Sequence, residues 1–387
     1  MRRFVLSLAL AATTLGPLAS DAIAQDQGRG RFPRKYLFSL IGAAVGTAVG
    51  GSYIAFQGQS QPGNCGDPSC VVAVTVSAGA LIGYMIGREF DELHALRYRG
   101  GAPLKPQSVS AGLIGDPTLL TVEDDLIAVG GSAGVQFFRS TPNQLRADGR
   151  RAAGVRGIAA LDLAQPGAMA LGSVTGLYLF PPREGPGALV RPGEIGATVT
   201  TVDRVFIGGG SRVESAPLSA DTSRTWPGVD VGSRVRDLEV DLGRNLVWAV
   251  TDSALVALRI AGDSLESVSS TPLDARPRTL ALEGSRLAVT FGEQGVRLFD
   301  ATEPTAPRLT AVWEGARFAY DVSLAGTRMF VAAGPEGLYV LDISADPVVI
   351  GLARELGFAA AVASFGPFTY VLDRSTNSVR RIESEFQ

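Results

Sequence analysis

The fold is decided by two short runs, Gly284-Ser-Arg-Leu-Ala-Val289 and Gly295-Val-Arg-Leu-Phe-Asp300. Both return 42 residues later, as Gly326-Thr-Arg-Met-Phe-Val331 and Gly337-Leu-Tyr-Val-Leu-Asp342. Each run is short, rich in Val, Leu, Phe and Tyr, and bounded by Gly, which is typical of β-strands rather than helices. A two-strand unit that returns in register predicts a repeat architecture.

The same two strands recur seven times along the chain. The first begins at Leu126, Met169, Val205, Leu246, Leu287, Met329 and Thr369, and the second at Val135, Leu177, Val213, Leu255, Val296, Leu338 and Val379. Successive copies of either strand are 36 to 43 residues apart. A period near 41 residues with about four strands per unit predicts an all-β, seven-bladed propeller over residues 108–387.

The two best-preserved units span residues 280–313 and 322–353. They resemble the LVIVD repeat of bacterial propeller proteins, and the other five units resemble it loosely. The resemblance implies the propeller fold. It implies no common activity, so it assigns no catalytic residue.

The two ends of the propeller are expected to meet in one blade. The last unit stops at Ile382-Glu-Ser-Glu-Phe-Gln387, which leaves no fourth strand. Residues 108–114 precede the first unit and are similar to the outer strands at 309–313 and 349–353. We therefore expect residues 108–114 to complete the last blade as its outermost strand and to close the ring. An open ring would leave unpaired strand edges, which favour aggregation.

The N-terminus has the pattern of a secretory signal peptide. Arg2 and Arg3 precede the apolar run 4–12, and Ala22-Ile-Ala24 provides a small-residue cleavage site. We expect residues 1–24 to be removed, which would make Gln25 the first residue of an exported protein. The alternative is an uncleaved membrane anchor.

Two apolar segments, 36–56 and 71–87, follow the signal peptide, and the first has no charged residue over 21 positions. Such a helix is long enough to cross a hydrocarbon core of about 30 Å. Each segment has a glycine at every fourth position, which places the glycines on one helix face and lets two backbones approach closely. These glycines are Gly42, Gly46 and Gly50 in the first segment and Gly79, Gly83 and Gly87 in the second.

This α-helical hairpin, residues 33–98, resembles the glycine-zipper two-transmembrane domain of bacterial envelope proteins. The resemblance implies a hairpin that is embedded in a membrane and can self-associate. The alternative is a buried helical hairpin in a soluble protein. Residues 99–107, which include Pro103, Pro106 and two adjacent glycines, are expected to be a linker to the propeller.

Charge and cysteine placement favour one compartment. Basic residues flank both ends of the hairpin, and the turn at 57–69 has none. At the inner membrane this pattern would place both ends in the cytoplasm, against the signal peptide, so the outer membrane is favoured over the inner. Cys65 and Cys70 lie in or beside the turn, where an oxidising space favours a disulfide, with free thiols as the alternative.

Composition limits the chemistry. The chain has 35 Lys and Arg against 38 Asp and Glu, which argues against a nucleic-acid partner. With one His and two Cys, we expect no catalytic residue, no metal site and no cofactor. His94 is expected to be an ordinary packed or solvated side chain.

Other candidate residues have ordinary structural interpretations. Asp300 and Asp342 occupy matching repeat positions and are expected to accept hydrogen bonds from turn amides. Glu123-Asp-Asp125 is interpreted as a strand-joining turn, with a calcium patch as the alternative. A basic cluster, Arg139, Arg146, Arg150 and Arg151, is expected to be a solvated face, and Trp226, Trp248 and Trp313 are partner anchors or, for Trp248, core.

The sequence therefore predicts a non-catalytic scaffold of the bacterial cell envelope. The hairpin would anchor it in the membrane, and the propeller would contact another envelope protein in the periplasm. The less favoured alternative is a propeller-type hydrolase or lyase with its active site at one channel mouth, where carboxylates would converge. A third hypothesis is a membrane assembly formed through the hairpin, which Gly46→Leu and Gly83→Leu would disrupt. The ligand-binding residues are not assigned.

Overall fold

The computed structural model describes residues 43–44, 107–111, 113, 115–141, 144–152, 154–164, 167–182, 185–219 and 225–383. The chain divides into two compact units, Met1–Ala95 and Leu96–Gln387. The predicted signal peptide, the six zipper glycines, Cys65, Cys70, His94 and most of the linker lie outside the described residues. Among the residues that are described, no helix combines the length and apolar character needed to cross a membrane.

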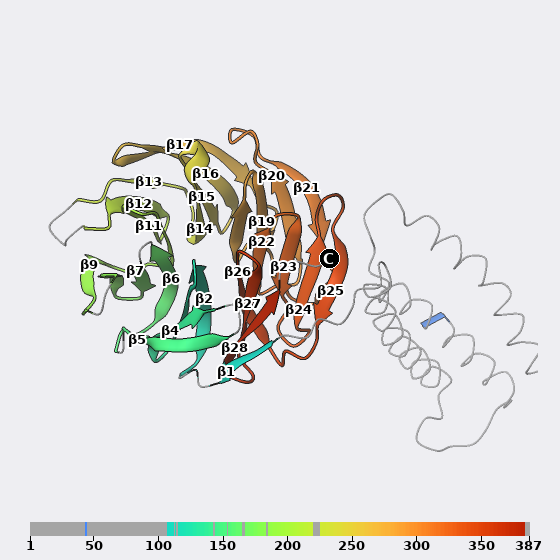
Figure 1. Cartoon of the computed structure of the whole chain (residues 1–387). Coiled ribbons are helices and arrows are strands. Elements are labelled where there is room, and N and C mark those ends of the chain that lie inside the picture. The colour runs from blue at the N-terminus through green and yellow to red at the C-terminus, as the bar shows by residue number, and fades with distance from the viewer. Residues whose placement is uncertain are drawn as a thin grey trace, which may run out of the picture. The chain divides into compact units, whose positions relative to one another are not determined.

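The second unit is a seven-bladed β-propeller, in which seven antiparallel four-stranded sheets follow one another around a ring (Figure 1). Blades 1 to 3 consist of β2 (Pro117–Glu123), β3 (Leu126–Gly131), β4 (Gly134–Ser140) and β5 (Leu145–Arg151); β6 (Ile158–Ala164), β7 (Ala168–Ser173), β8 (Gly176–Phe180) and β9 (Ala188–Pro192); and β10 (Ala197–Thr200), β11 (Arg204–Gly209), β12 (Arg212–Pro217) and β13 (Gly228–Asp230). Blades 4 and 5 consist of β14 (Val235–Asp241), β15 (Leu246–Thr251), β16 (Ala254–Ala261) and β17 (Ser264–Pro272); and β18 (Leu280–Glu283), β19 (Arg286–Thr290), β20 (Val296–Asp300) and β21 (Arg308–Trp313). Blades 6 and 7 consist of β22 (Asp321–Ala325), β23 (Arg328–Ala332), β24 (Leu338–Asp342) and β25 (Val348–Ala353); and β26 (Ala359–Phe365), β27 (Phe368–Asp373), β28 (Ser378–Glu383) and β1 (Gln107–Ala111).

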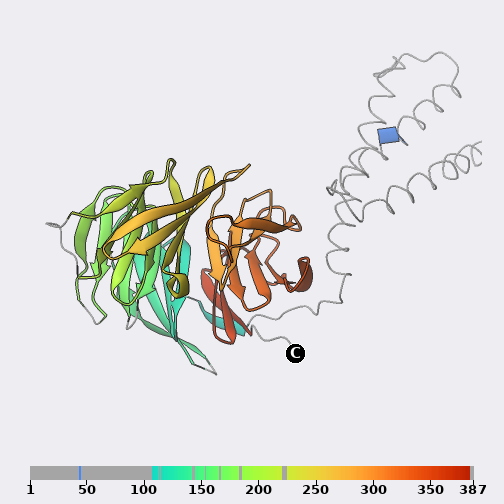
Figure 2. The same cartoon turned by 90° about the horizontal axis from the view of Figure 1, so that it is seen from above.

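All fourteen strands predicted from the two recurring runs are present, as the second and third strands of the seven blades. Strand β15 shows why these runs build a core. Its six residues are all buried. Because side chains alternate along a strand, Trp248 packs with residues of blade 5, whereas Val247 and Ala249 pack with residues of blade 3. Successive sheets therefore pack face to face around the ring (Figure 2).

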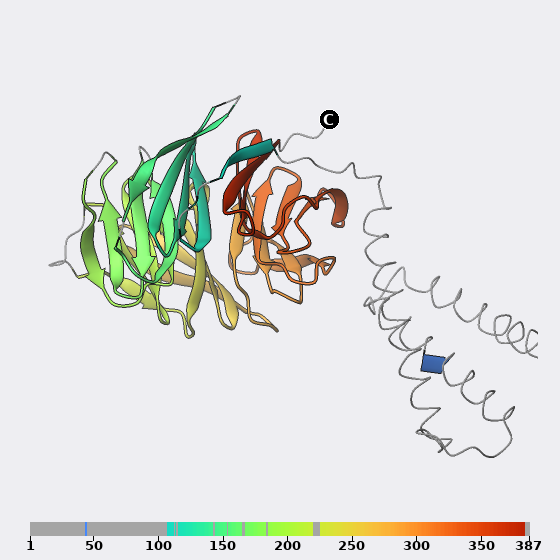
Figure 3. The ribbon, with the colours of Figure 1, turned by 90° about the horizontal axis from the view of Figure 1, so that it is seen from below.

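The two ends of the propeller meet in blade 7. Strand β1 pairs antiparallel with β28, next to which it lies in Figure 3. The Leu113 N–H donates to the Asn377 carbonyl oxygen at 3.2 Å, and the Leu113 side chain is buried in the core shared by blades 1 and 7. The outer-strand pairing predicted for residues 108–114 is thus present, over Gln107–Ala111.

The wider expectation, that this strand closes the ring, needs a correction. Each sheet is complete in itself, and within the described residues no continuous hydrogen-bonded ladder runs from one sheet to the next. Isolated bridges link Gly292 with Ala319 and Gly334 with Ala359. Hydrogen bonds of the strands therefore do not close the ring, because the sheets face each other instead of adding edge to edge.

Candidate functional site on the front face

The inner strand of every blade begins at the same end of the ring, which we call the front face; the opposite end is the back face. Neighbouring strands in each sheet are antiparallel. The loops that precede the inner strands and the loops between second and third strands therefore all gather on the front face. Binding residues are commonly found on loops that a rigid scaffold positions in this way.

Three aromatic rings stack side by side on the front face. The Phe318 and Tyr320 ring centroids are 4.5 Å apart, and those of Tyr320 and Phe358 are 5.1 Å apart in an edge-to-face arrangement. All three side chains are half-buried. They come from the loops before β22 and β26, so two adjacent blades contribute to one aromatic surface.

Two glycines at equivalent positions allow the rings to lie flat against the neighbouring loop. Gly292 and Gly334 both have φ near +60°, at +62° and +58°. A Cβ atom on Gly334 would lie 2.6 Å from Tyr320 Cε2, and one on Gly292 would lie 2.9 Å from Phe318 Cζ. The positive φ and the close approach both require glycine at these positions.

Two guanidinium groups complete this surface. Arg278 Cζ lies 5.1 Å from the Phe318 ring centroid and 5.9 Å from that of Tyr320, and Arg374 Cζ lies 5.9 Å from that of Phe358. Arg374 is paired with Asp116. In the described part of the chain, no carboxylate forms an ion pair with Arg278. We call Arg278, Phe318, Tyr320, Phe358 and Arg374 the aromatic–arginine cluster.

More arginines continue the front face over blades 3 to 5. Arg236 and Arg276 both bind the Asp252 carboxylate, with N–O distances of 2.6 and 2.9 Å. Arg234 is paired with Glu194. One sector of the front face is therefore rich in guanidinium groups, and the next sector carries the aromatic rings.

Below this face, the inner strands carry four carboxyl side chains. Three of them accept hydrogen bonds from the backbone of the next blade: Asp162 from the Thr200 N–H at 2.6 Å, Asp237 from the Leu280 N–H at 2.8 Å and Asp321 from the Val362 N–H at 2.9 Å. We call these three groups the carboxylate clasps. They join blade 2 to 3, blade 4 to 5 and blade 6 to 7.

The fourth carboxyl group, Glu239, lies on the same strand as Asp237 and accepts no hydrogen bond from any described residue. Burial raises its pKa well above the usual value, and repulsion from Asp237 and the other two clasps adds to this effect. Burial also raises the pKa of Asp237 to about 7 and those of Asp162 and Asp321 to about 6, although backbone N–H donors oppose the shift. Near neutral pH this group of acids therefore holds protons that it would release in the unfolded chain.

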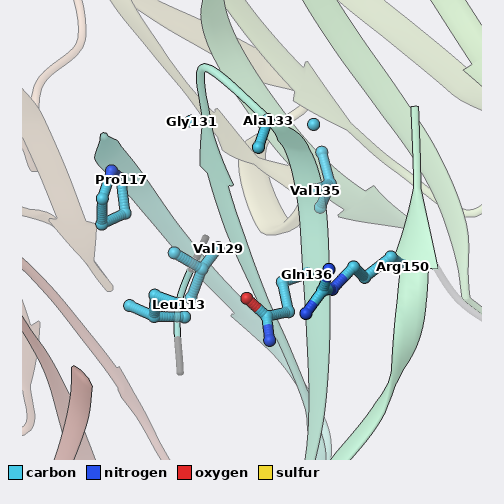
Figure 4. Close-up of a pocket in the computed structure, with 9 residues that line it drawn as sticks. Leu113, Pro117, Val129, Gly131, Ala133, Val135, Gln136 and Arg150 are labelled. Atoms are coloured by element: carbon cyan, nitrogen blue, oxygen red, sulfur yellow. The ribbon is translucent and has the colours of Figure 1, made fainter. Parts of the chain in front are cut away.

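These acids do not form a metal centre: within the described ranges, no three His, Cys, Asp or Glu side chains are arranged to ligate one ion. A small cavity lies at the seam between blades 1 and 7, bordered by Leu113, Val129, Gln136 and Arg150 (Figure 4). Its volume of about 10 Å³ has room for about one water molecule.

The structure settles several single-residue predictions. Asp300 Oδ1 accepts from the Thr302 N–H and Asp342 Oδ1 from the Ser344 N–H, both at 2.9 Å, so the predicted turn role is confirmed. Asp124 has a φ of +53° in the turn between β2 and β3, as the turn interpretation of 123–125 requires.

The tryptophans and the basic cluster turned out more constrained than expected. Trp248 is fully buried, as predicted for a core residue. Trp226 and Trp313 are 6% and 7% exposed, so their expected role as surface anchors is wrong. Arg139 is held by Asp125 at 2.8 Å and Asp148 at 3.1 Å, whereas the other described arginines of that cluster form no ion pair.

Sequence reasoning missed both the aromatic–arginine cluster and the clasps. The cluster comes from loops whose lengths vary between repeats, so it has no fixed period. The clasps did leave a signal: Asp237 and Asp321 are 84 residues apart, which is two repeat units. Aligning the inner strands as well as the two recurring runs would have brought them into register.

Comparisons with solved structures agree on the fold. The chain is similar to the WD40 β-propeller domain of Doa1, with a TM-score of 0.55 and 14% identity over 74% of this chain and 96% of that one. It is also similar to the β-propeller domain of Cps50 (Swd1) from Myceliophteria thermophila, with a TM-score of 0.60 and 11% identity over 73% and 100% of the two chains. U3-55K matches with a TM-score of 0.59 and 11% identity over 73% and 100%.

No protein-family model matches the chain, and no curated protein matches its sequence. The glycine-zipper and LVIVD resemblances therefore stay predictions. At 11 to 14% identity the structural similarities establish the fold alone. The C-terminal part of this chain is a seven-bladed β-propeller, a fold that suggests a protein-interaction scaffold.

Proposed function

We propose that this chain is a non-catalytic interaction scaffold of the bacterial cell envelope, which binds a partner protein through the front face of its propeller. The hairpin at 33–98 anchors it, in the outer membrane rather than the inner, and the propeller lies in the periplasm. The signal-peptide pattern, the zipper glycines and the cysteine pair support the location. The aromatic–arginine cluster carries the proposal for the binding face.

The cluster has the composition and support of a protein-binding surface. Aromatic and Arg side chains dominate the residues that contribute most to binding at protein interfaces. Phe318, Tyr320 and Phe358 are half-buried and held by two adjacent blades, so a partner loses little side-chain entropy when it orders them. Arg278 lies over two of the rings and has no ion pair in the described residues to break first.

The double substitution Phe318→Ala with Tyr320→Ala is expected to reduce partner capture by about tenfold, because it removes two central rings of the binding surface. The measurement is in-cell cross-linking of the tagged full-length protein, followed by quantitative mass spectrometry of the captured envelope proteins. Phe365→Ala is the matched control, since Phe365 is 40% exposed and lies on the back face. Equal capture by all variants, or loss with Phe365→Ala alone, would place the partner elsewhere.

The location makes a separate prediction. The mature protein is expected to begin at Gln25, to sediment with outer-membrane fractions and to contain a Cys65–Cys70 disulfide. N-terminal sequencing, membrane fractionation and thiol labelling before and after reduction measure these properties. A protein that keeps Met1, fractionates with the cytosol and has two reactive thiols would contradict the envelope proposal and leave the propeller interface to be judged by itself.

One observation favours the alternative of a propeller-type hydrolase or lyase: four carboxyl groups converge on the inner strands, where such an enzyme would hold its acid and base. Three of them, however, accept backbone hydrogen bonds that link neighbouring blades. Glu239 alone is uncommitted, and catalysis of this kind usually needs a pair of titrating groups with different roles. The geometry therefore supports the scaffold better.

A further inference from the structure

We infer that a cavity between blades 1 and 2 binds a flat, apolar anion such as an aryl carboxylate. The cavity has a volume of about 670 Å³, within the usual range for small-molecule sites of roughly 300–1,000 Å³. It is independent of the front-face cluster, since none of the five residues of that cluster lines it.

The interior of this cavity is largely aromatic. Phe137 from β4 and Tyr178 and Phe180 from β8 line it, together with Leu126 and Val155. Phe137 and Phe180 belong to the core shared by blades 1 and 2, so these two rings are fixed by packing behind the cavity. Rigid aromatic walls favour a flat, apolar ligand body that can stack against them.

The glycine-rich loop after β8 brings the backbone close to one of these rings. A Cβ atom on Gly187 would lie 2.3 Å from Phe180 Cζ, so this position admits only glycine. On the opposite side, the pairing of β4 with β5 is interrupted by a bulge between Phe137 and Phe138, and Gly149 in β5 has open space where a side chain would be. Bulges of this kind often occur beside binding sites.

The charge of the cavity comes from two arginines in different situations. Arg139 is neutralised by Asp125 and Asp148, at 2.8 and 3.1 Å. Arg151 donates to the carbonyl oxygens of Pro181 and Pro182, at 2.9 and 3.5 Å, and its Cζ lies 5.3 Å from the Phe137 ring centroid. No described carboxylate forms an ion pair with Arg151, so its charge is available to an anion.

Arg150 provides a matched control on the same strand. Arg151 is paired across the sheet with Val135, and Arg150 with Gln136, so the two arginine side chains lie on opposite faces of the blade. Arg150 borders both cavities, but its guanidinium group lies beside Gln136 at the seam cavity (Figure 4). Only Arg151 therefore presents its charge to the aromatic walls.

The test is equilibrium dialysis of the full-length protein against 2-naphthoate and its neutral counterpart 2-naphthamide, with the same detergent in both chambers. The native protein should bind one 2-naphthoate. Arg151→Gln should weaken its binding about tenfold while changing 2-naphthamide binding less than about twofold, because the lost interaction is charge-assisted. Arg150→Gln should leave both unchanged, and Arg151→Lys, which keeps the charge, should retain most of the 2-naphthoate affinity.

Several results would overturn the inference. The native protein could fail to bind 2-naphthoate, the affinity could survive Arg151→Gln, or Arg150→Gln could weaken it equally. Circular dichroism melting of each variant shows whether it is folded. If Arg151→Gln does not fold, the comparison of Arg151→Lys with Arg150→Gln decides, because loss of binding in both or in neither variant of the charge-bearing site relative to its control refutes a role for the Arg151 side of the cavity.

Discussion

Deleting residues 107–113 is expected to lower the melting temperature of the full-length protein by roughly 10 °C or more. The deletion removes the whole β1–β28 ladder and the buried Leu113 side chain. Loss of a buried leucine costs about 2–5 kcal/mol and each lost hydrogen bond about 1 kcal/mol. For a domain of this size, 1 kcal/mol corresponds to a shift of roughly 2–4 °C. Strand β28 would also become an exposed edge, which promotes aggregation.

The matched control deletes the same number of residues, 99–105, from the predicted linker and keeps β1. Circular dichroism at 218 nm (a wavelength chosen at about the β-sheet minimum) follows melting, and light scattering follows aggregation. The linker deletion should melt like the native protein. If the 107–113 deletion also melted unchanged, blade 7 would be stable with three strands, and the joining of the chain ends would not contribute to stability.

Glu239→Gln is expected to stabilise the propeller at pH 8, by about 2 kcal/mol or roughly 5 °C. Glu239 is buried beside Asp237 and accepts no hydrogen bond from the described residues, so Gln removes a repulsive titrating group without breaking any described interaction. At pH 5 the gain should be small, because the carboxyl group is protonated in the folded state and is near its ordinary pKa in the unfolded chain.

The same acids set the pH dependence of the native protein. Their folded-state pKa values are raised, to about 7 for Asp237 and about 6 for Asp162 and Asp321. Between about pH 4 and pH 7 the native state therefore binds more protons than the unfolded state, and its free energy of unfolding falls as the pH rises. The melting temperature should be lower at pH 8.0 than at pH 5.5, and Glu239→Gln should reduce that difference.

Thermal melts of the native protein and the variant at pH 5.5 and 8.0 measure both effects. Glu266→Gln is the control, because Glu266 is exposed on the outer strand of the same blade. It should change the melting temperature little at either pH. A native protein that is more stable at pH 8.0, or a Glu239→Gln variant with unaltered pH dependence, would show that Glu239 is well solvated in the folded state.

The propeller could be predicted from the sequence because its second and third strands obey strong local rules. Runs such as Leu246–Val250 are buried on both faces, so each position must be apolar and the run stands out between glycines. Even blade 3, whose spacing is only 36 residues, keeps both runs. The outer strand of blade 7 was predictable for the complementary reason that the last unit lacked one.

The candidate site could not be predicted in the same way. Phe318, Tyr320 and Phe358 lie in loops, where nothing in the local sequence fixes which rings will touch. The clasps depend on the relative height of neighbouring inner strands, as in the pairing of Asp237 with the Leu280 N–H. That height is set by packing between whole sheets, which a repeat alignment does not contain.

The central claim, that the front face binds a protein partner, is tested most directly by photo-cross-linking in living cells. A photoreactive phenylalanine analogue replaces Phe318 on the front face or, in a parallel strain, Phe365 on the back face. The account predicts one dominant envelope protein cross-linked from position 318 and not from position 365. A dominant partner captured from position 365 alone, or no protein captured from either position, would contradict it.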